Sequence, residues 1–195
     1  SAAWANGWFD WETFSIEVPQ RRADPIMFGS DEGIRPSTTM ESLSGLRPAF
    51  DKKGAVTAGN ASTLNDGASA VLIAEESYAL EQGWTIIATI EDYCTSGVEP
   101  HRVMSAPIPA VQALLERNGL GVLDVDVYEH NEAFASASCA VAQEVGIPDD
   151  RFNLHGGAVS LGHPLGASGT RCLITLLGVM RRLEAQSGIV TLCLG

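Results

Sequence analysis

From about residue 64 onward, short apolar runs alternate with longer runs that have helical spacing, and this alternation restricts the fold more than any other feature. Apolar runs of strand length bounded by turn residues predict buried strands, and the longer periodic runs predict helices. The expected strands are residues 68–74, 85–94, 125–130 and 188–194. The expected helices are residues 75–82, 107–118, 132–146 and 166–185. Such an alternation favours a layered α/β domain whose sheet is well covered by helices.

Residues 1–63 have a different character, because they hold many glycines and prolines and few periodic runs. A loop-rich stretch of this length is usually functional or part of a lid, so a separate loop region is expected here. The chain begins with Ser1 rather than methionine and ends at Gly195, where the last expected strand reaches its turn. We therefore expect a piece of a longer polypeptide, with the domain of residues 64–195 cut short in its last strand.

Composition narrows the range of partners. The net charge of -12 argues against nucleic acid, because there is no basic excess to replace the counterions of a phosphate backbone. A small anionic ligand stays compatible with this charge, since a few arginines and helix amides suffice to hold one. The sequence has no uninterrupted apolar stretch of about 20 residues, so no membrane span is expected. The cytoplasm is the favoured compartment, and an organelle is left open.

The cysteines predict neither disulfides nor a metal site. They lie far apart, without any Cys-x-x-Cys pair, at Cys94, Cys139, Cys172 and Cys193. In a chain of this size such spacing indicates reduced thiols, either buried or catalytic. No histidine and cysteine have the spacing of zinc ligands, so no metal is expected.

Reactive side chains occur where core strands meet turns. "HNEAF" follows the expected strand 125–130, "GHPLGASG" precedes the long helix, and "LCLG" closes the last strand. Ligand sites of α/β sheets gather at the carboxyl ends of strands. We therefore expect Asn131, His163 and Cys193 to converge, although many residues separate them in the sequence.

The order and spacing of these motifs closely resemble the thiolase family. The matching stretches are "TAGNASTLNDGASA" (57–70), "NEAFA" (131–135), "GGAVSLGHPLGASGTR" (156–171) and "LCLG" (192–195). They resemble the C-terminal half of the family, which implies a layered βαβαβ domain with a mixed, helix-covered sheet over residues 64–195. The resemblance also implies that residues 1–63 are the trailing part of the coenzyme A loop domain, and that the protein is a homodimer or homotetramer.

The resemblance further implies catalytic roles. His163 resembles the histidine that activates a nucleophilic cysteine and donates a hydrogen bond to the thioester oxygen. Asn131 resembles the residue that positions a water as the second donor of that oxyanion hole. Cys193 resembles the second catalytic cysteine, which moves a proton on the α-carbon or the leaving thiol. The backbone N–H of Gly195 matches a donor of a second oxyanion hole. Oriented donors and an imidazole suit this chemistry, because attack on a thioester develops an oxyanion and requires proton transfer.

Substrate contacts follow from the same resemblance. Ser62 matches a residue that contacts the pantetheine arm, and Arg35 matches an arginine near the nucleotide end of coenzyme A. Phe134 either lines the acyl pocket or only packs. Coenzyme A thioesters are thus the expected substrates and products, with no covalently bound cofactor.

The family's nucleophilic cysteine lies in its N-terminal half, which is not expected in this chain. "CTSG" at 94–97 has the form of the nucleophile signature but lacks the flanking asparagine and lies between the other motifs. We therefore exclude Cys94 as the nucleophile. The chain alone is expected to be inactive, as part of an acyltransferase that makes or cleaves 3-ketoacyl-CoA thioesters by ping-pong cysteine catalysis.

Other interpretations stay open. A condensing enzyme of the ketoacyl synthase type is disfavoured by "NEAF" and "LCLG". A non-catalytic fragment that binds coenzyme A or a nucleotide is a further alternative, although the glycine-rich loop has no standard phosphate-binding motif. Taken singly, His163 is compatible with a structural histidine, Asn131 with a helix N-cap, and Cys193 with a small buried hydrophobic residue.

Overall fold

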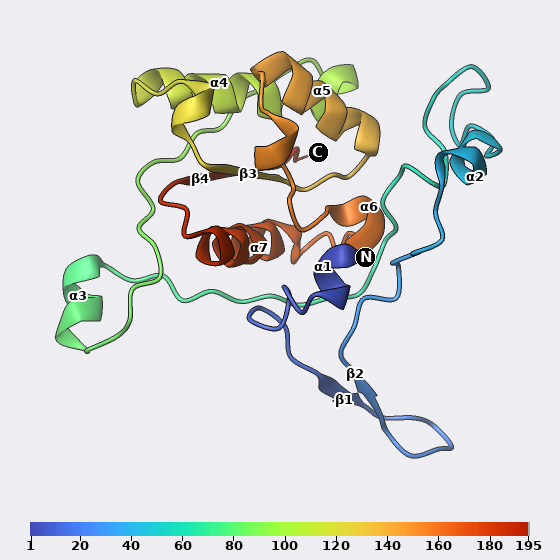
Figure 1. The fold of residues 1–195 in the computed structure, drawn as a ribbon, viewed down its shortest axis with the longest axis horizontal. Coiled ribbons are helices and arrows are strands. Elements are labelled where there is room, and N and C mark those ends of the chain that lie inside the picture. Colours follow the sequence, from blue (N-terminus) through green and yellow to red (C-terminus); the bar gives the residue numbers. More distant parts are fainter. Residues whose placement is uncertain (195) are drawn as a thin grey trace.

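A computed structural model describes residues 1–194, and its main body is a parallel strand pair between two layers of helices (Figure 1). Strand β3 (Val127–His130) pairs with β4 (Gly188–Thr191) in parallel, with His130 opposite Thr191. Helix α7 (Ser168–Leu183) covers one face of this pair, and helices α4 (Pro107–Arg117) and α5 (Ala135–Val145) cover the other. This is the expected layered α/β arrangement.

Smaller elements surround the body. The short helices are α1 (Ala2–Ala5), α2 (Met40–Ser44), α3 (Glu76–Glu81) and α6 (Ala158–Leu161). The 3₁₀ turns are η1 (Pro100–Ser105), η2 (Val122–Asp124) and η3 (Asp149–Arg151). Strands β1 (Ile16–Val18) and β2 (Ile26–Phe28) form an antiparallel hairpin. Among residues 1–194, no helix combines the length and the apolar character that a bilayer crossing requires.

Strand β3 is buried along its whole length, and its side chains alternate between the two helical layers. Tyr128 joins the cluster packed against α4 and α5, with Val111 and Val141. Val127 joins the cluster packed against α7, with Leu176 and Val179. This period of two also fixes where the strand's polar residues point.

The helix boundaries agree with the turn residues of the sequence. Helix α4 begins with a proline in its first turn, where a missing N–H costs nothing. Helix α5 ends at Gly146, whose φ of 85° is the left-handed conformation that glycine adopts most easily. The expected helices at 107–118, 132–146 and 166–185 are therefore confirmed, with ends shifted by one to three residues.

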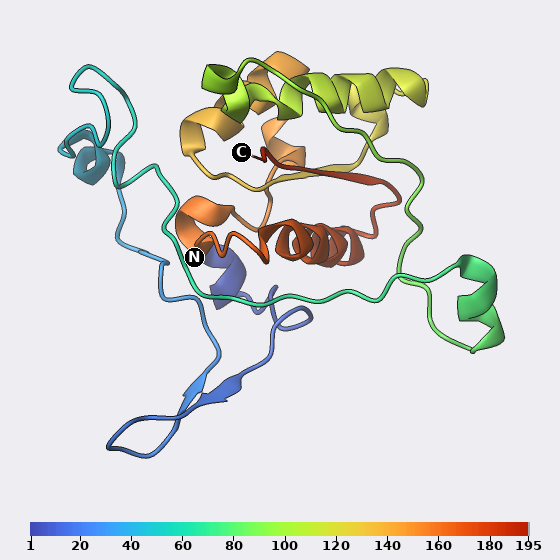
Figure 2. The same ribbon diagram turned by 180° about the vertical axis from the view of Figure 1, so that it is seen from behind.

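Two expected strands are wrong. Residues 68–74 and 85–94 have no strand structure, and most of their large apolar side chains are exposed. They run as extended segments outside the body, one before α3 and the other between α3 and α4 (Figure 2). A strand requires a hydrogen-bonded neighbour, and none lies beside these segments in the described part of the chain. Their β-forming composition alone does not create a sheet.

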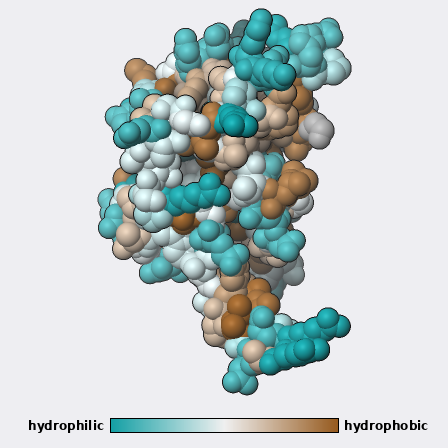
Figure 3. Space-filling view, turned by 90° about the vertical axis from the view of Figure 1, so that its right-hand side faces the viewer, coloured by the Kyte–Doolittle hydropathy of each residue, from teal (hydrophilic) through white to brown (hydrophobic). Residues whose placement is uncertain are grey.

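The N-terminal residues are largely loops, as expected, but part of them packs against α7. The Arg182 guanidinium lies 4.1 Å from the centre of the Trp8 ring, and Arg181 lies 5.5 Å from that of Trp11. Trp8 also stacks on His155, which accepts a hydrogen bond from Arg182. By contrast, the β1–β2 hairpin projects as a narrow lobe below the body (Figure 3).

His130 makes stability depend on pH. Its ring is fully buried against Ser138 and Phe152, and burial lowers its pKa from 6.5 to about 4. Between these values the unfolded chain binds more protons than the folded protein, so the contribution of His130 to stability falls as the pH falls. The penalty of His130→Gln should therefore be about 2 kcal/mol smaller at pH 5 than at pH 7.5.

Urea unfolding at the two pH values measures this difference, and comparison with wild type cancels the titration of other groups. His101→Gln is the control for replacing a histidine at an exposed position. A penalty of His130→Gln that is equal at both pH values would contradict the prediction.

Candidate active site

The candidate site is built where three segments meet. Asn131 to Phe134 follow strand β3, and residues 162–167 form the turn that enters helix α7. Residues 60–69, here called the strap, run between these two loops. The strap is bonded to the first loop by the Ser62 N–H, which donates to the Ala133 carbonyl at 3.0 Å. It is bonded to the second loop by the Thr63 carbonyl, which accepts from the His163 N–H at 2.9 Å.

Asn131 is buried and held on both sides. Its backbone N–H donates to the Thr191 carbonyl at 3.2 Å, which ties it to the end of β4. Its side-chain oxygen accepts from an Arg171 Nη at 3.4 Å and lies 3.6 Å from the Cys172 sulfur. These contacts orient the amide so that its nitrogen faces the His163 ring. Helix α5 begins at Ala135 with Phe134 as its N-cap, so Asn131 is not a helix cap.

The imidazole of His163 lies beside Asn131. The amide nitrogen of Asn131 is 3.4 Å from Nε2 and 3.5 Å from Nδ1, at the outer limit of hydrogen bonding. On the other side, Nδ1 lies 2.6 Å from the Ser168 hydroxyl. Burial and the nearby positive charge of Arg171 lower the pKa of His163. The ring is therefore favoured in its neutral form, which is the form that accepts a proton.

Gly162 allows the strap to approach this loop. Its φ is 93°, and a Cβ placed there would lie 2.5 Å from the side-chain oxygen of Asn65. That oxygen accepts from the His163 N–H at 3.2 Å. Any larger residue at position 162 would strain the backbone and displace the strap. The glycine before His163 thus serves a close approach of two segments.

Beneath the site lies a buried ion pair. The carboxylate of Glu129 points from β3 toward α7 and accepts from Arg171 at 3.2 Å. Glu129 is fully buried, and this burial raises its pKa to about 8 despite the adjacent guanidinium. Glu12 lies near the same arginine, and burial raises its pKa to about 7. Arg171 thus joins a core carboxylate to Asn131.

Cys193 lies two residues beyond β4, beside the parallel strand end that carries Asn131. Its sulfur is 3.5 Å from that of Met104 on η1, and the half-buried position raises the pKa of the thiol. No hydrogen bond joins Cys193 to His163 within residues 1–194. The structure therefore brings Asn131 and His163 into contact and places Cys193 at the neighbouring strand end.

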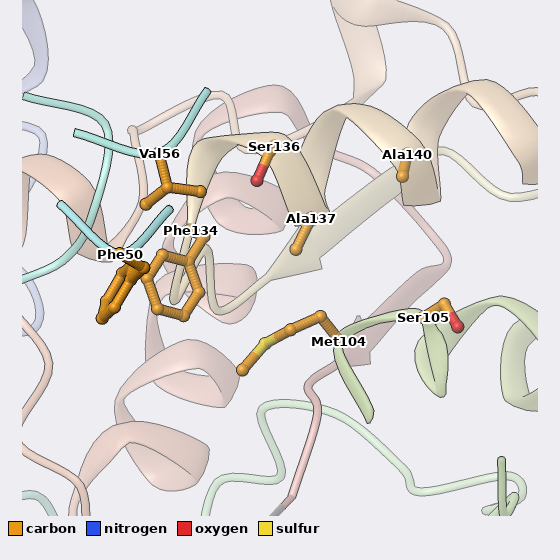
Figure 4. A pocket seen from close by; sticks show the side chains of 8 residues that line it. All are labelled: Phe50, Val56, Met104, Ser105, Phe134, Ser136, Ala137 and Ala140. Atoms are coloured by element: carbon orange, nitrogen blue, oxygen red, sulfur yellow. The ribbon is translucent and has the colours of Figure 1, made fainter. Parts of the chain in front are cut away.

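A mostly apolar pocket opens next to this strand end (Figure 4). Its volume is about 340 Å³, and its walls come from the loop region, η1 and the start of α5. Phe134 and Phe50 meet edge to face across it with ring centres 6.1 Å apart, and Met104 reaches in from η1. Phe134 therefore both packs and lines a pocket. Because Met104 also contacts Cys193, the pocket adjoins that thiol.

Other expected site residues lie farther from these contacts. Ser62 is on the strap, half-buried. Arg35 is exposed in the N-terminal region, and the described hydrogen bonds of Asn131 and His163 do not include it. Gly195 lies outside the described residues. Cys94 belongs to the extended segment 85–94, where its thiol hydrogen-bonds only to the Thr95 carbonyl among the described groups.

Sequence reasoning missed the residues that support the site. Ser168, Glu129 and the strap residue Asn65 all contact the Asn131–His163 pair or its immediate partners. Each lies within or beside a motif that the sequence displays, in "GASG", "YEHNEAF" and "LNDGASA". Glu129 and Asn65 contact residues 42 and 98 positions away, which the sequence does not indicate. Ser168 lies only five residues from His163, so its place in the same motif was the available signal.

Two family profiles match the chain. The profile "Thiolase, C-terminal domain" matches residues 84–195, and "Thiolase, N-terminal domain" matches residues 1–77. The first accounts for more than half of the chain and contains Asn131, His163 and Cys193. The second corrects the expectation that only a C-terminal half is represented, because the loop-rich region and the strap match the N-terminal domain.

Curated relatives and solved structures agree with these profiles. The chain is 46% identical over 194 residues to an acetyl-CoA acetyltransferase of Cupriavidus necator, covering 100% of this chain and 49% of that protein. It is 38% identical to the crystal structure of the Bacillus anthracis acetyl-CoA acetyltransferase, with a TM-score of 0.92 and coverage of 100% and 49%. Human mitochondrial 3-ketoacyl-CoA thiolase in complex with CoA gives 37% identity, a TM-score of 0.89 and coverage of 100% and 48%. The chain thus spans about half the length of the relatives it matches.

Proposed function

Because this chain belongs to the thiolase family, we propose that it forms part of an acyltransferase that makes or cleaves 3-ketoacyl-CoA thioesters. The observation that carries the proposal is the contact between Asn131 and His163 at the carboxyl end of β3. The amide faces the ring, the ring is favoured in its neutral form, and both are held by the body of the fold. Such a rigid pair suits a reaction that develops an oxyanion and transfers a proton.

In this proposal His163 acts twice. Its neutral imidazole takes the proton of a cysteine nucleophile, which frees the thiolate to attack the thioester. The protonated ring then donates to the oxygen on which negative charge develops. Asn131 positions a water as the second donor, since its amide nitrogen faces the same space as the ring. Fixed donors of this kind stabilise the charge without reorganising during the reaction.

Cys193 is the proposed proton carrier at the α-carbon. The raised pKa of its half-buried thiol favours the protonated form, which is the form that donates to a carbanion or to a leaving thiolate. Its position two residues beyond β4 lies beside the strand end that carries Asn131. A thiol carrier at this strand end is compatible with exchange of α-protons.

The pocket beside Cys193 is the proposed site for the acyl group and the adjoining pantetheine arm. Phe134 and Met104 offer apolar surface, and Ser62 on the strap offers a polar contact for the arm. Arg35 is proposed near the nucleotide end, and residues 1–63 as the loop region that holds coenzyme A, with residues 64–195 as the catalytic domain. The backbone N–H of Gly195 is proposed as a donor of the second oxyanion hole, and the whole protein as a homo-oligomer.

The nucleophile of this ping-pong reaction is proposed to come from protein sequence other than residues 1–195. The signature "CTSG" at 94–97 lacks the flanking asparagine and lies between the other motifs, and among the described groups the Cys94 thiol hydrogen-bonds only to the Thr95 carbonyl. Residues 1–195 alone are therefore expected to be inactive. The experiments that follow accordingly use the full-length protein.

Cys193→Ser tests the proposal directly. The substitution should leave acylation of the protein by acetyl-CoA within about tenfold of wild type and lower α-proton exchange by at least about 100-fold. A serine hydroxyl holds its proton far more tightly than a thiol, so transfer to and from carbon slows while the acylation step does not use this residue. Intact-protein mass spectrometry measures acylation, and loss of deuterium from labelled acetyl-CoA measures exchange.

Cys94→Ser is the matched control, because it removes a thiol outside the site. It should change neither the acylation nor the α-proton exchange. Acylation and exchange that are both absent in wild type would instead support a non-catalytic binding role. Exchange that continues undiminished in Cys193→Ser would exclude this residue as the proton carrier. Turnover of acetoacetyl thioesters and of longer 3-ketoacyl thioesters then defines the acyl chain length.

A further inference from the structure

The geometry points to Ser168 as the positioning residue that holds His163 in the tautomer protonated on Nδ1. Ser168 is in the first turn of α7, the residue is 1% exposed, and its hydroxyl lies 2.6 Å from Nδ1. The same hydroxyl oxygen lies 2.9 Å from the Pro164 carbonyl oxygen. The hydroxyl thus bridges the ring and the backbone of the turn that carries it.

Counting protons selects one tautomer. The Ser168 hydroxyl has a single proton, and the Pro164 carbonyl can only accept. If the hydroxyl donates to Nδ1, two oxygens face each other at 2.9 Å without a proton between them. If it donates to the Pro164 carbonyl, it accepts from an Nδ1–H and both short contacts become hydrogen bonds. In a buried setting the fully bonded arrangement is favoured, because an unpaired polar contact costs about 1 to 3 kcal/mol.

This tautomer determines which ring nitrogen of His163 can accept a proton. With the proton on Nδ1, the lone pair of neutral His163 lies on Nε2, and the Asn131 amide nitrogen is nearly equidistant from the two ring nitrogens, at 3.4 Å from Nε2 and 3.5 Å from Nδ1. Nε2 is then the atom that takes a proton and afterwards donates it. Because the Ser168 oxygen accepts from Nδ1–H in both charge states, it keeps the ring orientation unchanged through that transfer. This catalytic consequence rests on the proposed function, whereas the tautomer itself does not.

A second serine–histidine pair in the chain gives an internal contrast. The Ser138 hydroxyl on α5 lies 2.7 Å from Nδ1 of His130, and the Glu132 N–H donates to the same nitrogen at 3.3 Å. A backbone N–H can only donate, so Nδ1 of His130 must be unprotonated. The two histidines therefore have opposite tautomers: the Ser168 hydroxyl selects Nδ1–H at His163, and the Glu132 N–H selects Nε2–H at His130.

Nitrogen-15 NMR of labelled protein reads both tautomers, since protonated and unprotonated ring nitrogens resonate far apart. The chain has 4 histidines, and His163→Asn and His130→Asn assign the two signals. We expect Nδ1–H at His163 in wild type, and loss of that preference in Ser168→Ala. Ser138→Ala is the matched control: it removes the serine hydroxyl beside His130 but leaves the Glu132 N–H in place, so both His130 and His163 should keep their wild-type tautomers. Ser168→Thr retains the hydroxyl and should restore the wild-type tautomer.

Activity of the full-length protein gives the second reading. Ser168→Ala should lower kcat/KM by about 10- to 100-fold, by analogy with the loss that follows removal of a partner that orients a metal-binding histidine, and Ser168→Thr should recover most of the loss. Wild-type His163 protonated on Nε2 would overturn the proposal without any variant. An unchanged tautomer in folded Ser168→Ala would overturn it as well. If the tautomer changes as expected but wild type has no acyltransfer activity, the positioning role stands and the proposed function fails.

Discussion

Replacing His163 by alanine is expected to lower kcat/KM for acyl transfer by about ten-thousand-fold. The imidazole supplies both a general base and an oxyanion donor, and each such role is worth about a hundredfold or more. The substitution removes the ring but not the backbone bonds of residue 163, because the His163 N–H remains bonded to the strap. The loss therefore reflects missing chemistry rather than a collapsed loop.

Two measurements locate the defect. Intact-protein mass spectrometry should show no acyl-enzyme after incubation with acetyl-CoA, because the nucleophile is no longer activated. Circular dichroism should remain that of wild type. His101→Ala is the control for removal of an exposed histidine, and its activity should stay within about twofold. A His163→Ala protein that retains a tenth of the wild-type activity would remove this residue from the mechanism.

Arg171→Met is expected to be the most destabilising of the substitutions considered, by about 3 to 5 kcal/mol at pH 8.5, where most of the Glu129 carboxyl is ionised in the folded wild-type protein. Methionine roughly keeps the volume but leaves the fully buried Glu129 carboxylate without its counter-charge. It also removes the donor that orients the Asn131 side-chain oxygen, so activity should fall together with stability. Urea unfolding followed by circular dichroism measures the change.

The pH dependence of Arg171→Met identifies the cause. Burial already raises the pKa of Glu129 from 4.5 to about 8, so its neutral form predominates well below pH 8. A folded pKa above the unfolded value means that stability is present at low pH and declines as the pH rises through that window. The penalty of Arg171→Met should thus be larger at pH 8.5 than at pH 5.5. Adding Glu129→Gln should recover part of it at pH 8.5, and a penalty independent of pH would contradict the ion-pair account.

Much of the body was predictable, because its signals are local. The helical period, the prolines and the terminal glycines indicated the helices, and a short segment with valine and tyrosine between two of these helices indicated strand β3. The segments 68–74 and 85–94 have equally good strand composition but no neighbour among the described strands. Amino-acid composition indicates how well a segment suits a β-sheet. The hydrogen bonds of a sheet also require a neighbouring strand, and composition does not specify one.

The sequence likewise predicted only some of the contacts in the candidate site. That Asn131 and His163 meet follows from their positions at the ends of neighbouring elements, which the sequence displays. The supporting contacts of Ser168 and Arg171 depend on side-chain direction at the start of α7, which no spacing rule supplies. Glu129 is the clearest case, since strand periodicity places it in the core, yet only the facing helix explains why a carboxylate is tolerated there.

The strap has a consequence for protein engineering. It is bonded to both loops of the site, through Ser62 on one side and Thr63 and Asn65 on the other. A chimera that exchanges catalytic domains between relatives at the apparent boundary of residues 63 and 64 would cut through the middle of these bonds. Such a hybrid would join loops from one parent to half of a tether from the other. A crossover placed after residue 70 keeps the tether and its two loops from one parent, so the geometry of Asn131 and His163 is inherited as a unit.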